Sequence, residues 1–140
     1  MLLRYKVTIT LSILAVLAFI FVCSLYFVTH AFADEPTTLT ASWYSIASLK
    51  SEGTYAYSKG VMANGKTFKD EGLTCATRLW PLGTTLRITD VRSLRSVDVV
   101  VTDRIGKRFA DKRIDLSKAA FKKIAALTDG VVAVQIERIR

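Results

Sequence analysis

Two aspartates in this chain lie in sequence segments that are compatible with a role in acid-base chemistry. Asp103 lies near the end of the run VVVTDR at residues 99–104, which predicts a buried strand that carries a carboxylate at its end. Asp115 lies in the segment RIDLS at residues 113–117. A pair of carboxylates can cleave glycosidic bonds, one group acting as acid and the other as base or nucleophile. Glycan cleavage is therefore one candidate chemistry.

Both aspartates also have a structural explanation. Strand alternation predicts that Asp103 shares a face with Val99 and Val101, an apolar setting in which a general acid keeps its proton until it donates it. However, aspartates at strand ends commonly accept hydrogen bonds within turns, and Asp115 precedes a predicted helix start whose free amides it can bind. Spacing alone favours the structural role, and the distance between the two acids is not visible in the sequence.

The residue inventory excludes several other chemistries. The single histidine, His30, precedes the expected N-terminal cleavage site, so the exported domain has no imidazole base and cannot form a Ser-His-Asp triad. Cys75 is the only cysteine of that domain, which therefore lacks an ordinary set of zinc ligands and an internal disulfide. No phosphate-binding glycine loop is present. We expect no metal and no cofactor, and we interpret Cys75 as a small buried residue.

The elements that must position the two acids are predicted to be mostly strands. Ser117 is the expected N-cap of one helix, which ends at Asp129-Gly130. The apolar face of this helix consists of Ala120, Phe121, Ile124 and Leu127. Apolar patterns between turn residues predict short strands at 39–44, 73–76, 84–89, 96–103, 113–116 and 131–139. Together these elements indicate a small β-barrel.

A polar, glycine-rich excursion occupies residues 45–72. A structureless loop of this length is unusual in a small domain unless it is functional or carries short elements of its own. We therefore expect this excursion to line a groove.

The first 33 residues have the pattern of an export segment. Arg4 and Lys6 precede an apolar stretch at residues 7–28, and Ala31-Phe32-Ala33 provides an A-x-A cleavage site. The stretch has 22 residues, enough to span a bilayer, so an uncleaved membrane anchor is the alternative to a signal peptide. Residues 34–38 are expected to form a polar lead and residues 39–140 a single domain. Both alternatives predict an exported protein of the periplasm, cell envelope or extracellular space.

The charge balance suggests an anionic partner. The chain carries a formal net charge of +8, and without Arg4 and Lys6 there are 18 basic and 12 acidic residues. A cell wall or a membrane face suits an exported domain better than nucleic acid, and we expect a monomer. Basic residues flank the two aspartates in the sequence, and they would either hold an anionic polymer or only solvate a loop. These residues are Arg104, Lys107, Arg108, Lys112 and Arg113. Alternatively, the net charge only keeps a small domain soluble.

Six short motifs follow one another along the domain. They are ASWY at 41–44, MANG at 62–65, LTCA at 73–76, PLGT at 81–84, TDR at 102–104 and IDLS at 114–117. In this order, and with the closing strand from Gly130 to Glu137, they resemble the RlpA-like double-psi β-barrels. That family includes the rare lipoprotein A lytic transglycosylases of peptidoglycan. The match runs from Ser42 to Arg140, and it is specific only when the motifs are taken together.

The resemblance implies a fold, a substrate and a set of site residues. The fold is mainly β, a six-stranded double-psi β-barrel with one short helix and a groove across one side. The partner is the peptidoglycan glycan strand, cleaved between MurNAc and GlcNAc to leave a 1,6-anhydro end. Asp103 matches the family's catalytic aspartate, which acts as general acid and then as general base, and Asp115 matches a second family aspartate. The substrate-binding residues implied are Tyr44, Asn64, Thr77 and Arg104.

The chain departs from the family pattern at two places. Thr77 stands where the family usually has a histidine, and a threonine hydroxyl does not exchange a proton near neutral pH. The usual Asp-Arg-Gly-Pro is changed here to Asp103-Arg104-Ile105-Gly106. The missing histidine supports an alternative function, a catalytically silent, expansin-like module that binds cell-wall glycan. An inhibitor or other interaction protein, which would need neither acid, is a third possibility.

Overall fold

A computed structural model describes residues 15–24 and 36–139. The chain divides between Asp34 and Glu35 into two units, and residues 15–24 of the first unit are helical. Within the described residues, none of the helices has the length and apolar character needed to cross a membrane. The predicted cleavage site at residues 31–33, and most of the predicted signal or anchor at residues 1–33, lie outside the described residues.

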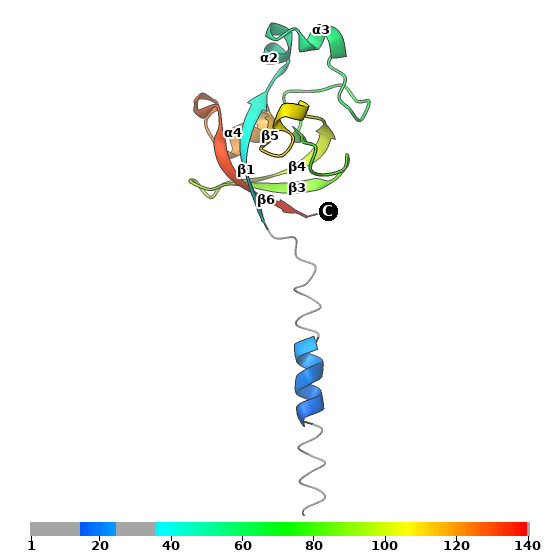
Figure 1. Ribbon diagram of the computed structural model, residues 1–140. Helices are drawn as coiled ribbons and strands as arrows, with labels where there is room; N and C mark the ends of the chain where they lie inside the picture. Colours follow the sequence, from blue (N-terminus) through cyan, green and yellow to red (C-terminus); the bar gives the residue numbers. More distant parts are fainter. Residues whose placement is uncertain (1–14, 25–35, 140) are drawn as a thin grey trace, which may run out of the picture. The chain divides into compact units, whose positions relative to one another are not determined.

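The second unit is a closed, six-stranded barrel, which confirms the predicted mainly β fold (Figure 1). Around the barrel the strand order is β1-β5-β2-β4-β3-β6. Two pairs of neighbours, β1 with β5 and β2 with β4, run parallel, and the other pairs run antiparallel. The strands are β1 (Thr37–Tyr44), β2 (Thr74–Ala76), β3 (Thr85–Asp90), β4 (Ser96–Asp103), β5 (Arg113–Ser117) and β6 (Val132–Arg138).

Alternating side chains explain how these strands enclose a core. In β6, Val132, Val134 and Ile136 are buried, while the residues between them are exposed. This period of two places one row of β6 inside the barrel and the other row in solvent. Cys75 is fully buried in the same core, as predicted, and burial raises the pKa of its thiol, so it is an inert packing residue.

Several strand ends differ by one or two residues from the sequence prediction, and strand pairing explains two of them. β1 begins at Thr37, inside the predicted polar lead, because Thr37 pairs with Ile136 of β6. β5 extends to Ser117, which pairs with Tyr44 of β1 and is also the N-cap of the following helix. Pairing with the neighbouring strand, rather than the apolar pattern, therefore sets these two limits.

The helix after β5, α4 (Lys118–Ile124), confirms the predicted start and corrects the predicted end. The Ser117 hydroxyl accepts a hydrogen bond from the amide of Ala120, as an N-cap does. The helix ends at Ile124, before Asp129-Gly130, because Ala125 is in an extended conformation. A separate 3-10 turn, η2 (Leu127–Asp129), follows.

The polar excursion after β1 carries two helices that the sequence did not predict, α2 (Ile46–Ser51) and α3 (Thr54–Ser58). Ser45 and Ser48 form a capping box at the start of α2, which fixes where the chain leaves β1. Both helices project at one end of the barrel (Figure 1). A 3-10 turn, η1 (Lys107–Phe109), lies between β4 and β5.

Candidate active site

The end of β4 contains a β-bulge that decides where Asp103 points. Val101 pairs with Cys75 of β2, but the next pair is Asp103 with Ala76, so Thr102 is an extra residue on β4. Val101 and Thr102 are both buried, which breaks the alternation of the strand. Asp103 therefore leaves the inward face. The prediction that Asp103 shares a face with Val99 and Val101 is wrong, and the bulge is the reason.

Strand pairing then places both aspartates in one row on the outside of the barrel. Asp103 pairs with Ala76, Ala76 pairs with Asp115, and Asp115 pairs with Ser42. Residues that pair across strands point to the same face of a sheet. Neighbouring strands lie about 4.8 Å apart, so the two aspartate backbones, with β2 between them, are roughly 10 Å apart.

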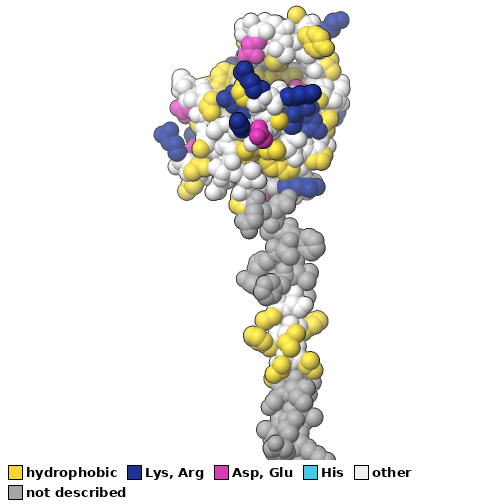
Figure 2. All heavy atoms as spheres, viewed as in Figure 1, with side chains coloured by type: hydrophobic (Ala, Val, Ile, Leu, Met, Phe, Trp, Pro, Cys, Tyr) yellow, Lys and Arg dark blue, Asp and Glu magenta, His cyan; other side chains and the backbone are white. Residues whose placement is uncertain are grey.

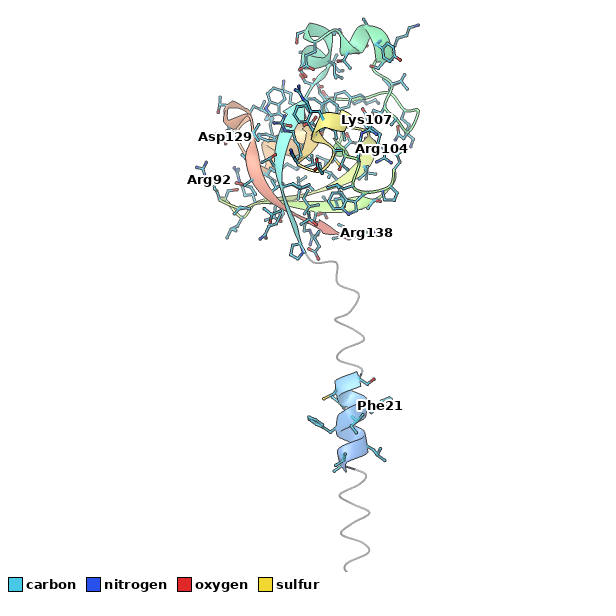
Figure 3. All side chains as sticks on the ribbon, in the orientation of Figure 1. Phe21, Arg92, Arg104, Lys107, Asp129 and Arg138 are labelled. Carbon is cyan, nitrogen blue, oxygen red and sulfur yellow. The ribbon has the colours of Figure 1, made fainter. Side chains whose placement is uncertain are left out.

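This row opens into a cleft of about 410 Å³, which we call the acidic cleft. Its walls come from the end of β1, the α2–α3 excursion, and the segment after β4 that includes η1. Arg104 and Lys107, labelled in Figure 3, lie at this end of the barrel. The lining residues are Ser42, Trp43, Tyr44, Leu49, Glu52, Thr54, Ala76, Asp103, Arg104, Ile105, Gly106, Phe109, Arg113 and Asp115.

Asp103 is held in one orientation by backbone amides. Its Oδ1 atom accepts hydrogen bonds from the amide of Ala63 at 3.0 Å and from its neighbour Arg104 at 2.8 Å. None of the hydrogen bonds formed by the described residues uses the other oxygen, Oδ2. The carboxyl group is half-buried and lines the acidic cleft, so Oδ2 is the oxygen left for a ligand.

Asp115 is half-buried in the wall of the cleft. The Ser42 hydroxyl donates a hydrogen bond to Asp115 Oδ1. Burial raises the pKa of the Asp115 carboxyl, the charge of Glu52 raises it further, and the Ser42 hydrogen bond and the Arg113 charge oppose the shift. Asp115 therefore keeps a proton more readily than an aspartate in water, and a protonated carboxyl can donate a hydrogen bond to a sugar.

Tyr44 also lines the cleft, and its hydroxyl oxygen is buried. Its ring stacks on Phe68, with 4.5 Å between ring centroids and an interplanar angle of 24°. The hydroxyl is buried and has no hydrogen-bond partner among the described residues, although the Thr74 hydroxyl lies near it. Burial, followed by the nearby Asp103 charge, raises the pKa of Tyr44, so the phenol stays protonated and can donate.

Thr77 and Arg104 take part in hydrogen bonds of the turn at residues 77–80. Thr77 is fully buried, and its hydroxyl accepts the amide of Leu79 rather than facing the cleft. Arg104 lines the cleft, but its Nη1 donates to the carbonyls of Thr77 at 2.7 Å and Trp80 at 2.8 Å. Its guanidinium therefore holds the 77–80 turn beside β4. Thr77 does not line the cleft, and Arg104 has a structural role there.

Asn64 does not share the cleft with the two aspartates. Its side-chain oxygen accepts the amide of Lys66, and its own amide donates to the Thr102 carbonyl. It lines a second cavity on the other side of the segment that binds Asp103. Of the predicted site residues, the structure brings together Tyr44, Asp103, Arg104 and Asp115.

The cleft contains residues that the sequence analysis missed. Glu52 lies just after α2 and adds a third carboxylate, for which the only signal was the length of the excursion. Phe109 contacts the guanidinium groups of Arg108 and Arg113, each 4.7 Å from the ring centroid. Several Lys and Arg side chains gather on this face of the barrel (Figure 2). Basic and acidic groups thus flank one another along the cleft.

The arrangement can bind a polar ligand and transfer a proton. It offers two half-buried carboxyl groups, one with a free oxygen and one whose pKa is raised, and a buried phenol without a partner among the described residues. Among the described residues, no three histidine, cysteine, aspartate or glutamate side chains come together as metal ligands do. These groups match the requirements of acid-base chemistry on a sugar.

Comparison with known proteins gives relatives along most of the barrel. The family described as lytic transglycolase matches residues 37–136. The endolytic peptidoglycan transglycosylase RlpA of Pseudomonas aeruginosa strain UCBPP-PA14 is 38% identical over 100 residues, which cover 71% of this chain and 26% of the relative. The protein of the same name from Campylobacter jejuni is 32% identical over 114 residues, covering 81% of this chain and 38% of the relative. The chain thus spans less than half the length of these two relatives.

Among solved structures, the Streptomyces papain inhibitor is similar in fold. It gives a TM-score of 0.58 at 22% sequence identity, covering 78% of this chain and 98% of the inhibitor. At this identity, the similarity concerns the fold alone.

Proposed function

Because this chain belongs to the RlpA-like double-psi β-barrel family of lytic transglycosylases, we propose that it cleaves peptidoglycan glycan strands in the acidic cleft. The bond to be cleaved is the linkage from MurNAc to GlcNAc, and the product carries a 1,6-anhydro end. We propose that the protein acts in the cell envelope and that residues 1–33 direct its export, either as a signal peptide or as a membrane anchor.

The observation that carries this proposal is the half-paired carboxyl of Asp103. Two backbone amides hold Oδ1, and Oδ2 is left at the cleft, so the group is both oriented and available. A general acid needs this combination, because proton transfer requires the acid within hydrogen-bond reach of the leaving oxygen.

The proposed reaction has two proton transfers on one residue. Asp103 Oδ2 donates its proton to the glycosidic oxygen as the bond from MurNAc C1 to that oxygen breaks. The 6-hydroxyl oxygen of the same MurNAc bonds to C1 and gives its proton to the Asp103 carboxylate, which restores the acid. Water is not consumed, so no second carboxyl is needed to activate water. Asp115 and Tyr44 are proposed to hold the sugar by donating hydrogen bonds.

The absent histidine favours a second candidate function, a module that binds cell-wall glycan without cutting it. Thr77 is fully buried and does not line the cleft, so its hydroxyl cannot relay a proton to a ligand there. Such a module would use the basic face for binding, and its glycan affinity would fall as salt rises. No new anhydro or reducing ends would form.

Digestion in isotopically labelled water tests the proposed reaction. Residues 35–140, which contain the whole hydrophobic core, are incubated with peptide-free glycan strands in H₂¹⁸O, and the new ends are weighed by mass spectrometry. We expect anhydro ends that carry no ¹⁸O. Reducing ends that carry ¹⁸O would show hydrolysis instead. Binding without new ends would favour the non-cutting module, and both results would overturn the proposal.

A further inference from the structure

An exposed apolar group lies at the turn between β3 and β4, which the proposed reaction does not use. Leu94 in this turn is 75% exposed, and Val91 and Val131 are exposed as well. Val131 belongs to the neighbouring segment, because the amide of Val91 donates to the carbonyl of Ala133 near the start of β6. We call Val91, Leu94 and Val131 the apolar tip. Apolar side chains that gather on a surface in this way indicate a site for a partner.

The turn that carries Leu94 is fixed by hydrogen bonds on both of its sides. The carboxylate of Asp90 accepts the amides of Arg92 at 3.3 Å and Ser93 at 3.0 Å, and the Leu94 amide donates to the Asp90 carbonyl at 2.9 Å. The Ser93 hydroxyl donates to the carbonyl of Ile124, at the end of α4. These bonds hold the turn against α4 and keep the Leu94 side chain in solvent.

The backbone of Leu94 is in an unfavourable conformation as well. Its φ is +58°, in the left-handed region that favours glycine or asparagine over a bulky side chain. Neither this angle nor the exposed leucine side chain stabilises the barrel. Residues held in sparsely populated backbone conformations often occur at functional sites. Leucine at this position therefore indicates a contact outside the fold.

The charges around the apolar tip indicate the sign of the partner. Asp90 is buried and its carboxylate binds turn amides, and Asp98 is paired with Arg87. Asp129 is an exposed acid on this side of the barrel, where Figure 3 also shows Arg92. The exposed basic residues in the turn and in the adjoining last turn of α4 outnumber it, and they are Arg92, Arg95, Lys122 and Lys123. An anionic surface is therefore favoured.

The small size of the apolar tip indicates a lipid surface rather than a protein. A stable protein interface buries about 800 Å² on each partner and uses about 20–30 residues on a side, which three side chains do not supply. The β3–β4 turn projects from the side of the barrel (Figure 1). A projecting aliphatic residue can enter the boundary between headgroups and acyl chains without a matching shape, while basic residues beside it attract anionic headgroups.

We propose that the apolar tip and the basic residues beside it bind the barrel to an anionic phospholipid membrane. Leu94 enters the lipid interface, and Arg92 and Arg95 bind headgroup phosphates. The inference does not rest on the proposed reaction. Asp103 is at the other end of β4 from this turn, and a strand of 8 residues is roughly 23 Å long, so the acidic cleft stays clear of the bilayer.

Cosedimentation with vesicles tests the proposal. Residues 35–140, which form one compact unit and contain the whole hydrophobic core, are mixed with vesicles of phosphatidylglycerol and phosphatidylcholine in equal amounts. Vesicles of phosphatidylcholine alone are the comparison. We expect binding to the anionic vesicles that weakens as salt rises, and much weaker binding to the neutral ones.

Two variants separate the apolar contribution from the charge. Leu94→Asn keeps a residue that tolerates the positive φ, and it should bind anionic vesicles about tenfold more weakly, because a leucine side chain no longer enters the lipid. Leu79→Asn is the matched control, since Leu79 is exposed in the turn at residues 77–80. Arg92→Gln with Arg95→Gln should weaken binding about thirtyfold at low salt. Lys107→Gln with Arg108→Gln removes the same charge after β4 and should bind like the wild type.

A tryptophan at the tip reports insertion directly. In Leu94→Trp, phosphatidylcholine with brominated acyl chains, mixed with phosphatidylglycerol, should quench the added fluorescence, whereas in Leu79→Trp it should not. No binding to anionic vesicles, equal binding by Leu94→Asn or by the arginine variant, or no quenching at position 94 would overturn the proposal. The same would follow if the protein formed a dimer without vesicles that Leu94→Asn abolished, because the tip would then be covered by a second copy. None of these results depends on glycan cleavage.

Discussion

Replacing Tyr44 with phenylalanine removes one buried oxygen atom and leaves the rest of the side chain in place. The Tyr44 hydroxyl has no hydrogen-bond partner among the described residues, although it is buried. The ring stacks on Phe68 and would keep that contact in the variant. The substitution therefore isolates the hydroxyl, which we propose is kept for the sugar rather than for the fold.

The expected gain in stability follows from this burial. A buried polar group without a partner costs about 1–3 kcal/mol relative to a paired or hydrated one. We use the lower end of this range, because the Thr74 hydroxyl lies near the Tyr44 hydroxyl. We therefore expect Tyr44→Phe to raise the free energy of unfolding by about 1 kcal/mol. For a domain of this size that corresponds to a rise in Tm of about 4–8 °C. Affinity for glycan should fall at the same time, because a donor to the sugar is lost.

Urea unfolding of residues 35–140 measures the change, with the fluorescence of Trp43 and Trp80 as the signal, since both pack against the core. Tyr57→Phe is the matched control, because Tyr57 is 95% exposed and loses the same atom without any change in burial. A loss of stability of about 1 kcal/mol in Tyr44→Phe, with Tyr57→Phe unchanged, would refute the reasoning, because it would show that the Tyr44 hydroxyl is paired in the fold.

Two further predictions concern stability. The pKa of Asp115 is raised in the folded state, so the stability this group contributes is present below its ordinary value of 3.8 and is lost as pH rises through the folded pKa. Asp115→Asn should therefore be more stable than the wild type in urea unfolding at pH 7, with the difference disappearing below about pH 3.8, and a variant that is less stable at pH 7 would contradict this. Gly60 has φ of +73°, and a Cβ there would lie 2.9 Å from Tyr55 Cε2, so Gly60→Ala should lower stability by about 1–2 kcal/mol. Gly106→Ala is the control, since a Cβ there meets nothing within 4 Å and the backbone angle is ordinary, and equal losses in both variants would show that the strain argument is wrong.

The sequence was sufficient for most of the barrel because its strands follow a local rule. The buried pattern of β4 and β6 repeats every second residue, and Ser117 caps α4 through its own side chain. These signals depend on near neighbours in the chain. The helices α2 and α3 were missed, because they have only 6 and 5 residues and neither helix buries a residue.

The site was less predictable, because it depends on contacts between distant segments. The bulge at Thr102 exists only in the pairing with β2, and it turns Asp103 to the outer face against the alternation of its own strand. Thr77 is buried in a turn whose carbonyls bind the guanidinium of Arg104, a residue 27 positions away in the chain. Sequence motifs identified which residues match the family pattern, but only the pairing of the strands showed which of them face the same space.

The central claim is that Asp103 performs both proton transfers without an imidazole partner. The direct measurement is the rate of anhydro-end formation from peptide-free glycan strands by the wild type, Asp103→Asn and Asp98→Asn. Asp98 lies on the same strand but is exposed and paired with Arg87, so it is a matched control. We expect Asp103→Asn to lose a factor of about 100 or more, as loss of a general acid does, and Asp98→Asn to keep its rate. Equal rates for the wild type and Asp103→Asn would contradict the account.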